Sequence, residues 1–505
     1  MTHRISHILF LWNLLFAGLV LLSPISPAIA YECYFDGPCG HVFTTEQEVT
    51  FGAEGKEEVG AMRVVNFDGK TVETIPVTER GKRLPVNLGK MTPGIYWITE
   101  VDGRVLYTFA VIPPAGRTMK SEDSPFGVHY AYVDNEMDRA ESRLDLLNKA
   151  GVVWVRCTTY VTPNKENPDT FDWSARDKIV EMVNERSMNM LSFFEQNNFP
   201  SEFFPARKKG EAALWNEPRT LRMVQDYVAH FKGKLNYFEV WNEPGDNPDN
   251  AVTFSKAFYE VAKKANPDAV VVQGALACVA YPGQWGVKNM AQDRQKRYLE
   301  LGLAKYTDVF NFHFYPYQWK TDDIVPQFMA IYAKYKQTKP VWVTENGISA
   351  APKDMFQQKR QAEYLVRSST TCFHLGIDKY FWFLGWDHPE FKYGLLEENL
   401  EPKAAYVAYA VLTKLLDGME LGSSTKLNLD RITGYTFNVP KGKTAVLWAE
   451  EESVAVDPRT ILPNSPRVKL FDIMGRAMPL NDQSKITLSP QSPVYIVWEG
   501  KETKQ

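Results

Sequence analysis

Two short apolar runs in this chain each end in a glutamate. The first is Tyr237–Pro244, with the letters Tyr-Phe-Glu-Val-Trp-Asn-Glu-Pro, and the second is Lys339–Gly347, with the letters Lys-Pro-Val-Trp-Val-Thr-Glu-Asn-Gly. Two carboxyl groups at strand ends can divide acid and base work, because one can protonate a leaving oxygen while the other attacks or shields a developing cation. This is the requirement for breaking a glycosidic bond. We therefore predict Glu243 as the proton donor and Glu345 as the nucleophile.

The sequence Trp-Asn-Glu-Pro occurs twice, at 215–218 and at 241–244, so this motif alone does not identify the catalytic glutamate. A glutamate that closes a strand is more often an ordinary loop residue. The context separates the two copies, because residues 235–240 form an apolar and aromatic run typical of a strand, whereas Pro218 stands where a first helical turn begins. Apolar residues follow that proline at helical spacing, at Leu221, Val224, Val228 and Phe231. We interpret Glu217 as structural and Glu243 as functional.

Length and composition limit the possible classes of protein. A chain of 505 residues is too long for one ordinary domain and can hold a large barrel with smaller modules. A hydrophobic fraction of 44% and a charged fraction of 23% are typical of a globular protein, and the formal net charge of -4 gives no electrostatic reason to expect a nucleic-acid partner. Aromatic residues make up 13% of the chain, which suits the stacking of sugar rings but also the cores of barrels and sandwiches.

The first thirty residues have the pattern of a secretory signal peptide. Arg4 precedes an apolar run from Ile8 to Leu22, and the small-x-small sequence Ala28-Ile-Ala30 follows. We predict cleavage after Ala30 and an exported protein, periplasmic or extracellular. No later run approaches the roughly 18 to 20 apolar residues of a spanning helix, so we expect no membrane span.

Five cysteines are present, which is an odd number. Cys33 and Cys39 lie close together near the predicted mature N-terminus, where an oxidising compartment would allow a disulfide. Cys157, Cys278 and Cys372 are scattered and are interpreted as buried thiols. The absence of a Cys-x-x-Cys pair argues against a zinc ribbon.

Residues 31–112 contain short alternating runs separated by turn residues. Residues 95–102 and 105–112, for example, are joined through Asp102-Gly103, which is a hairpin signal. We predict a small N-terminal β-sandwich domain over residues 31–118, after a signal peptide at 1–30, with a role in support or in sugar binding.

Residues 122–418 alternate between candidate strands and candidate helices. Eight strands are predicted, at 126–129, 152–156, 188–193, 237–241, 269–274, 309–314, 341–344 and 380–384. Eight such units fit an α/β fold of the (β/α)₈ TIM-barrel type, in which active groups lie at the carboxyl ends of the strands. A doubly wound open sheet is the structural competitor, but no Gly-rich phosphate loop follows any strand. A helix at 402–416 would close the barrel, and residues 420–505 are predicted to form a C-terminal β-sandwich domain.

With these motifs in place, the chain resembles the retaining β-glycosidases of glycoside hydrolase clan A, and its three-part layout is similar to family 39 and neighbouring families. In that clan the acid/base residue follows an asparagine at the end of the fourth barrel strand, and the nucleophile ends the seventh. The corresponding positions here are Asn242-Glu243 and Glu345, and the independent strand count also puts them on the fourth and seventh strands.

The resemblance implies further residues that bind substrate or hold the glutamates. Arg156 ends the second strand, where clan members keep an arginine near the nucleophile, although a lone arginine is more often a salt-bridge residue. Asn242 is expected to hydrogen-bond the sugar 2-hydroxyl. Tyr315 is similar to the clan tyrosine that donates to the nucleophile, and His313 is expected either to line the site or to be a satisfied core histidine.

Aromatic and polar residues at other strand ends complete the predicted site. Trp382 resembles the tryptophan beneath the reactive sugar, with Trp386 as the alternative if the strand is shifted. The remaining expected sugar contacts are His129, Glu195, Gln196, Asn197, Trp285 and Tyr317.

The predicted function is retaining hydrolysis of a β-linked glycan through a covalent glycosyl-enzyme, without metal or cofactor. A metal-dependent barrel hydrolase would need clustered ligands such as His-x-His on the first strand, and this strand supplies His129 alone. A non-catalytic carbohydrate-binding protein on a glycosidase-like barrel is the alternative from another class. Hydrolysis and transfer to another sugar share the same intermediate, so both stay open, as do the sugar, the linkage, endo or exo action and the oligomeric state.

Overall fold

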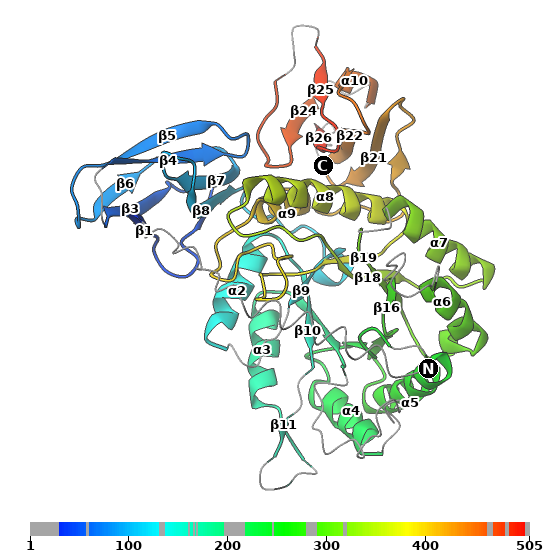
Figure 1. Ribbon diagram of the computed structural model, residues 1–505. Coiled ribbons are helices and arrows are strands. Elements are labelled where there is room, and N and C mark those ends of the chain that lie inside the picture. The colour runs from blue at the N-terminus through cyan, green and yellow to red at the C-terminus, as the bar shows by residue number, and fades with distance from the viewer. Residues whose placement is uncertain are drawn as a thin grey trace, which may run out of the picture.

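The computed structural model describes residues 30–499, except for 57–59, 131–136, 160–161, 165–166, 168–169, 196–217, 245–246, 279–289, 317–320, 462–467 and 480–483. Its centre is a nine-stranded sheet in which all strands are parallel (Figure 1). The strands are, in chain order, β9 (Phe126–Tyr130), β10 (Trp154–Thr158), β13 (Asn189–Phe193), β14 (Tyr237–Glu239), β15 (Val270–Val272), β16 (Leu276–Cys278), β17 (Phe310–Phe314), β18 (Val341–Asn346) and β19 (Lys379–Trp382).

Helices alternate with these strands along the chain, except between β15 and β16. They are α2 (Met137–Lys149), α3 (Ser174–Glu185), α4 (Pro218–His230), α5 (Pro248–Ala265), α6 (Met290–Glu300), α7 (Thr321–Lys334), α8 (Met355–His374) and α9 (Ala404–Leu415). Helix α4 begins at Pro218 and buries Val224 and Val228, as its spacing predicts. Helix α5 ends at Ala265, where the backbone N–H of Asn266 bonds the Ala262 carbonyl. The alternation of strand and helix predicted for residues 122–418 is therefore present in the structure.

The sheet curls. The first strand, β9, pairs with β10 and with the last strand, β19, and the two strands at the edges of the sheet, β15 and β16, are consecutive in the chain. Strand β15 pairs with β14, and β16 pairs with β17. Only residues 273–275 separate β15 from β16, and an isolated parallel bridge joins Val272 to Val309. This arrangement is a mixed α/β fold consistent with a TIM-like barrel. The single fifth strand predicted at 269–274 is instead two short strands with an irregular link.

Side chains alternate between the inside of the curled sheet and the helices outside it. A separate cluster of buried residues fills the inside, with Trp154, Leu191, Trp342 and Phe381 among its members. The neighbours of Phe381 point the other way, since the hydroxyl of Tyr380 meets Ser368 on α8 and the ring of Trp382 lies 6.2 Å from that of Tyr364 on α8. This parity decides which residues near the carboxyl ends of the strands face the site.

The N-terminal part of the chain contains a three-stranded and a five-stranded sheet. The strands are β1 (Tyr31–Tyr34), β2 (Val42–Thr44), β3 (Thr50–Gly55), β4 (Gly60–Asn66), β5 (Thr71–Val77), β6 (Leu84–Asn87), β7 (Gly94–Thr99) and β8 (Val105–Ile112). Strands β7 and β8 are antiparallel, as the Asp102-Gly103 turn predicts. The two sheets share a buried cluster that includes Phe51, Val64, Ile98 and Phe109. Strands β7 and β8 also contact α9, which attaches this part to the barrel.

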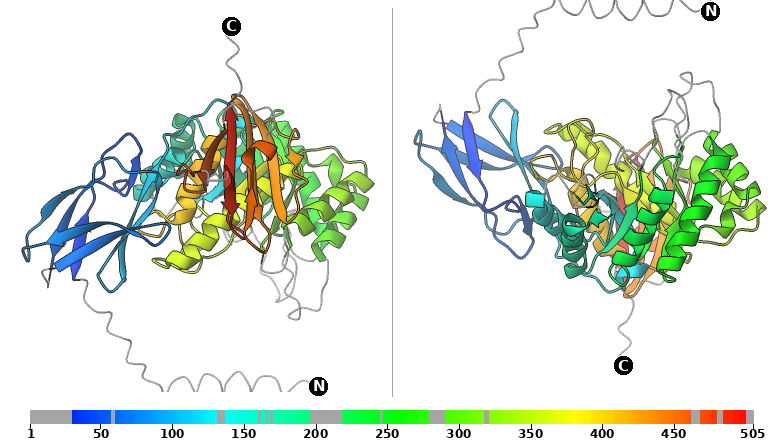
Figure 2. Two further views of the ribbon diagram at one scale, coloured as in Figure 1. Left: turned by 90° about the horizontal axis from the view of Figure 1, so that it is seen from above. Right: turned by 90° about the horizontal axis from the view of Figure 1, so that it is seen from below.

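The C-terminal part contains a five-stranded and a two-stranded sheet. The strands are β20 (Thr425–Lys426), β21 (Ile432–Val439), β22 (Gly442–Ala449), β23 (Val454–Val456), β24 (Val468–Asp472), β25 (Ile486–Leu488) and β26 (Val494–Glu499), with the short helix α10 (Pro458–Ile461). Figures 1 and 2 show these strands on the side of the barrel formed by α8. The ring of Tyr435 on β21 stacks on that of His374 at the end of α8, with centroids 4.4 Å apart.

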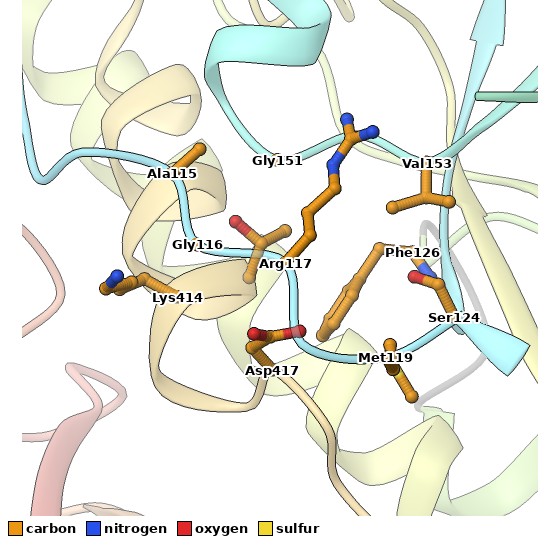
Figure 3. Close-up of a pocket in the computed structure, with 11 residues that line it drawn as sticks. Ala115, Gly116, Arg117, Met119, Ser124, Phe126, Gly151, Val153, Lys414 and Asp417 are labelled. Atoms are coloured by element: carbon orange, nitrogen blue, oxygen red, sulfur yellow. The ribbon is translucent and has the colours of Figure 1, made fainter. Parts of the chain in front are cut away.

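The segment between the N-terminal sheets and β9 is fixed by polar contacts with α9 and its neighbours. Figure 3 shows Arg117 in this segment beside Gly151 and Val153. Its guanidinium donates to the carbonyl of Val152 over 2.6 Å, and the Asp417 carboxylate accepts from the backbone N–H and the hydroxyl of Thr118. A cavity of about 10 Å³ remains there, room for one water at most.

The cysteines of the described residues are all free thiols. The Cys33 thiol lies 4.0 Å from the sulfur of Met62, and the Cys39 thiol contacts the carbonyl of Ser142, so the disulfide expected between them is not formed. Cys157, Cys278 and Cys372 are buried, as expected. Within the described part of the chain, no helix has the length and apolarity needed to cross a bilayer.

Candidate active site

The candidate catalytic residues meet at the carboxyl ends of the parallel strands. His129, Arg156 and Glu239 lie on β9, β10 and β14, and His313 and Glu345 lie on β17 and β18. A register shift between Phe312 and His313 sets His313 opposite Glu345 across β17 and β18. Strands from distant parts of the chain thus deliver these polar side chains to one place, as barrel folds do.

Arg156 lies at the centre of the hydrogen-bond network of the site. Its side chain is fully buried, and it donates to both carboxylate oxygens of Glu239, over 2.7 Å from Nε and 2.8 Å from Nη2. It also donates over 2.6 Å to Oε1 of Glu345 and over 2.9 Å to Oδ1 of Asn242. Burial opposes the guanidinium charge, but the carboxylates of Glu239 and Glu345 outweigh it and raise the pKa of Arg156. Arg156 therefore stays charged and holds Glu239, Glu345 and Asn242 at once.

Glu345 is buried and is held at both oxygens. Arg156 donates to Oε1, and the hydroxyl of Tyr315 donates to Oε2 over 2.7 Å. Hydrogen bonds of this kind stabilise the charged form of a carboxylate and fix its orientation. Burial, followed by the charges of Glu345 and Glu243, raises the pKa of Tyr315 well above its usual value, so this residue remains a donor. The arrangement suits an ionised carboxylate that attacks a carbon from a fixed position.

Glu243 has an unusual backbone conformation. Its φ of 45° lies in the left-handed region, which few residues other than glycine adopt. Pro244 follows, and a proline disfavours the right-handed helical conformation for the residue before it. The backbone near Glu243 is also crowded, because a Cβ on Gly274 would lie 2.8 Å from the carbonyl oxygen of Trp241. Strained conformations of this kind persist where surrounding structure holds them, and they concentrate at functional sites.

The carboxyl group of Glu243 contacts His313. Oε1 of Glu243 lies 3.0 Å from Nδ1 of His313. The Glu243 side chain is 37% exposed, but the protein packed around its carboxyl partly desolvates it and raises its pKa, while the positive charges of Arg156 and Arg294 oppose the shift. A glutamate with a raised pKa keeps its proton to a higher pH, which is the property of a general acid.

His313 is fully buried and links Glu243 to the barrel wall. Its Nε2 lies 2.8 Å from the hydroxyl of Thr344, which also receives an N–H from Asn311 over 2.8 Å. Burial and, to a lesser degree, the charge of Arg156 lower the pKa of His313 to about 4 against the pull of Glu345, so the ring is neutral above that pH. The same hydroxyl donates to Oδ1 of Asn311 over 3.1 Å, so it accepts from Nε2, and Nδ1 is left as the acceptor that faces Glu243.

His129 is a second buried, neutral histidine. Its Nδ1 lies 2.8 Å from Nη1 of Arg156 and accepts a hydrogen bond there. Burial lowers the pKa of His129 well below its usual value, and the charges of Arg156 and His313 act in the same direction. His129 therefore supports Arg156.

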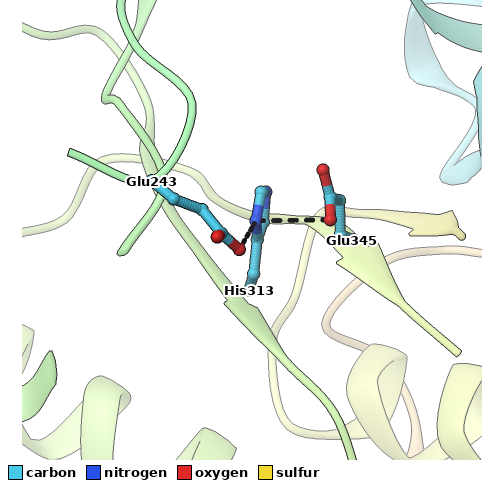
Figure 4. A group of neighbouring side chains, drawn as sticks. All are labelled: Glu243, His313 and Glu345. Carbon is cyan, nitrogen blue, oxygen red and sulfur yellow. Dashed lines mark hydrogen bonds and ion pairs between the residues drawn. The ribbon is translucent and has the colours of Figure 1, made fainter. Parts of the chain in front are cut away.

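Figure 4 shows the two glutamates on either side of His313. One oxygen of Glu243, one nitrogen of His313 and one oxygen of Glu345 all lie within 4.8 Å of one another. Donor atoms this close can in principle hold a metal ion. The guanidinium of Arg156, 2.6 Å from Glu345, disfavours a dication at this point by charge repulsion.

Asn242 and Glu195 also reach this cluster. Asn242 accepts from Arg156, and its side chain hydrogen-bonds Glu195. Burial raises the pKa of Glu195, while Arg156 and the bond to Asn242 oppose the shift. The two residues therefore lie where a sugar hydroxyl could find both a donor and an acceptor.

The aromatic residues of the eighth strand do not lie as the sequence predicts. Trp382 is fully buried outside the sheet, and its indole N–H donates to the carbonyl of Tyr393. Trp386 is buried against Tyr130, with centroids 4.6 Å apart. The ring that faces the site is that of Phe383, which contacts Tyr315 and His129 at centroid distances of 5.9 and 5.0 Å.

Some predicted residues lie outside the described part of the chain. These are Gln196, Asn197, Trp285, Tyr317 and the structural glutamate Glu217. Three residues that the sequence analysis did not single out belong to the site, namely Glu239, Thr344 and Phe383. The signal for Glu239 was a charged residue two positions after Tyr237 in an otherwise apolar strand, a pattern that requires a buried partner.

Comparison with known proteins agrees with this geometry. Residues 210–422 match a family model described as "Glycosyl hydrolase catalytic core". This region contains Glu243, His313 and Glu345. The fold, the glutamate pair and this match support a glycoside hydrolase. No curated protein matches the sequence.

Several solved structures share the fold. A family 39 glycoside hydrolase from Bacteroides cellulosilyticus WH2 has a TM-score of 0.71 at 19% identity, over 93% of this chain and 100% of that one. A monomeric β-xylosidase from Caulobacter crescentus CB15 has a TM-score of 0.51 at 13% identity, over 77% and 98%. A glucosidase from Croceicoccus marinus has a TM-score of 0.50 at 15% identity, over 76% and 97%. The fold therefore resembles that of a family 39 glycoside hydrolase, as the motifs of the sequence predict.

Proposed function

We propose that this chain is an exported retaining glycoside hydrolase that cleaves a β-linked glycan by double displacement. The observation that carries the proposal is the approach of Glu243 and Glu345, whose carboxylate oxygens lie within 4.8 Å. Carboxyl groups about 5 to 5.5 Å apart are typical of retaining enzymes, whereas inverting enzymes need about 6.5 to 9.5 Å to admit a water.

In the first step, the proton of Glu243 passes to the glycosidic oxygen as the bond from that oxygen to the anomeric carbon breaks. An oxygen of Glu345 forms a bond to the same carbon, which gives a covalent glycosyl-enzyme. Arg156 and Tyr315 hold Glu345 for this attack. The raised pKa of Glu243 keeps the required proton in place.

In the second step, a water attacks the anomeric carbon and passes a proton to Glu243, which is now a carboxylate. The bond to Glu345 breaks, and the sugar leaves with its original anomeric configuration. Phe383 offers an apolar face beside the site for the C–H surface of the sugar ring, the role that the sequence analysis gave to Trp382. Transfer to another sugar would follow the same course with a hydroxyl group in place of water.

The proposal extends to the organisation of the chain. The curled sheet is taken as a (β/α)₈ barrel over residues 122–418, between β-sandwich domains at 31–118 and 420–505, after a cleaved signal at 1–30. The sharing of one buried cluster by two N-terminal sheets supports the first sandwich. A second cluster, which includes Ile432, Leu447 and Leu488, supports the other.

The test uses substitutions of the two glutamates. The fold neighbours include a β-xylosidase and a glucosidase, so aryl β-xylosides and aryl β-glucosides are the first substrates to try. Glu345→Gln should abolish turnover. Glu243→Gln should lower turnover by about 10² to 10⁴-fold. The loss should be smallest for substrates whose leaving group needs no proton. Glu300→Gln is the matched control, because Glu300 lies at the surface, where it accepts from Tyr335 and pairs with Arg297.

The stereochemistry of the product decides between mechanisms. Proton NMR of the first sugar released should show the β anomer, and the α anomer would contradict double displacement. Unchanged hydrolysis by Glu345→Gln would show that Glu345 is not the nucleophile. Binding of glycans without hydrolysis by the wild type would favour the non-catalytic alternative.

A further inference from the structure

A second cavity lies beside the site, between the barrel and the C-terminal part of the chain. It has a volume of about 910 Å³. Its lining comes from the segments after β17 and β18, from the first three turns of α8 and from Gln491 in the C-terminal part. None of the candidate catalytic residues lines it.

The cavity is nevertheless close to the glutamate pair. Pro316 lines it and directly follows Tyr315, whose hydroxyl bonds Glu345. Tyr364 also lines it, and its hydroxyl donates over 3.0 Å to Asn346, the residue after Glu345. A glycan chain that leaves the site on the side of β17 and β18 would therefore reach this cavity.

One stripe of α8 supplies most of the lining. Phe356, Arg360, Glu363, Tyr364 and Arg367 follow the spacing of three, four and seven residues that places side chains on one helix face. Phe356 is 70% exposed, although it is a large apolar residue. An exposed ring beside long polar side chains is typical of a surface that binds sugars.

Two arginines in this stripe form no close ion pair. No carboxylate of the described residues lies within 4.0 Å of the guanidinium of Arg360 or Arg367; Glu363 acts on both charges from farther away, and the Arg367 side chain donates to the backbone carbonyl of Glu363. The acidic residues of the lining already accept hydrogen bonds from other side chains. Asp354 accepts two bonds from Gln357 at the start of α8, and Glu363 bonds Ser492.

We propose that this cavity binds a carboxylate-bearing sugar unit of the glycan whose neighbouring units occupy the glutamate pair. Arg360 and Arg367 would receive the carboxylate, and Phe356 would pack against the ring. The inference rests on the proposed function for the position of the glycan, but the binding site itself depends only on α8 and its neighbours. A guanidinium offers planar paired donors that fit a carboxylate, and each charge-assisted bond is stronger than a bond to a neutral hydroxyl.

The test compares two β-linked tetrasaccharides that differ in one unit, which is glucuronic acid in one and glucose in the other. These probes differ only at one carbon, where a carboxylate replaces a primary alcohol. Binding is measured by calorimetry on Glu345→Gln, which retains the glycan uncleaved. We expect the acidic probe to bind about 10- to 100-fold more tightly, and the preference to weaken as salt is added.

The double variant Arg360→Gln/Arg367→Gln, in the same background, should lose most of this preference. Arg222→Gln is the matched control, because Arg222 is an arginine on α4 with a 63% exposed side chain, and the preference should remain. Equal binding of both probes, or a preference unchanged in the double variant, would overturn the proposal. An acid preference in a wild type that hydrolyses no glycoside would contradict the proposed function and leave the binding site standing.

Discussion

Arg156 and Glu239 form a fully buried ion pair with two parallel hydrogen bonds of 2.7 and 2.8 Å. Glu239 does not contact Glu345 through any hydrogen bond of the described residues. It acts through Arg156, whose Nη1 then points to Glu345. Glu239 on β14 thereby orients the nucleophile on β18, although the two strands are not neighbours in the sheet.

Glu239→Gln tests this relationship. The substitution removes one charge of a buried pair and leaves Arg156 partly uncompensated, so we expect a loss of about 3 to 5 kcal/mol in the free energy of unfolding. Chemical denaturation measures this change, and kcat should fall in the fraction that remains folded. A stability within about 0.5 kcal/mol of the wild type, as for an ordinary surface change, would show that the pair contributes little.

Tyr315→Phe removes the second donor to Glu345. The lost bond is charge-assisted and of the kind that contributes about 1.5 to 3 kcal/mol, so kcat/KM should fall by about 10- to 100-fold. Tyr335→Phe is a matched control, since Tyr335 donates to Glu300 over 3.0 Å outside the site. Steady-state kinetics on an aryl glycoside distinguish the two variants, and equal rates for both would contradict the role of Tyr315.

The sequence predicts the alternation of strands and helices and the pair of glutamates, because both depend on local patterns. It does not predict which face each residue of the eighth strand takes. Residues 380–383 read Tyr-Phe-Trp-Phe, and a run that is aromatic at every position carries no alternation to orient it. The parity comes from tertiary packing, since Tyr380 and Trp382 contact α8. Thr344 was missed for a related reason, because its role depends on Asn311 and His313 on the neighbouring strand.

Phe383 and Trp382 are neighbours with different predicted effects. Phe383→Ala removes the ring beside the site, and we expect kcat/KM to fall by about 10-fold with a small change in stability. Trp382→Ala opens a cavity in the layer between the sheet and α8, and we expect a loss of about 3 to 5 kcal/mol in the free energy of unfolding. Kinetics and denaturation on both variants measure the two effects. The opposite pattern would show that Trp382 faces the sugar after all.

His313 should set the upper pH limit of activity through Glu243. The active form needs a proton on Glu243, so kcat/KM falls as the pH rises through the pKa of that residue. Nδ1 of His313, 3.0 Å from Glu243, accepts from the protonated carboxyl, because the hydroxyl of Thr344 donates to Asn311 and leaves the ring proton on Nε2. His313→Phe removes this acceptor and leaves the protonated form of Glu243 less stable. We therefore expect the alkaline limb of the pH profile to move downward by roughly one unit.

His313→Gln keeps a hydrogen-bond acceptor, the amide oxygen, near the same place and should leave the alkaline limb close to that of the wild type. The profile of kcat/KM is the quantity to measure, because it reports the ionisation of the free enzyme. Below pH 6.5 His313 also affects the stability of the fold, because its pKa in the folded protein, about 4, is lower than its usual value. The unfolded chain then binds more protons than the folded one, so stability falls as the pH drops from about 6.5 toward 4. An upward shift of the alkaline limb in His313→Phe would show that Nδ1 donates to the carboxylate of Glu243 instead of accepting from its protonated form.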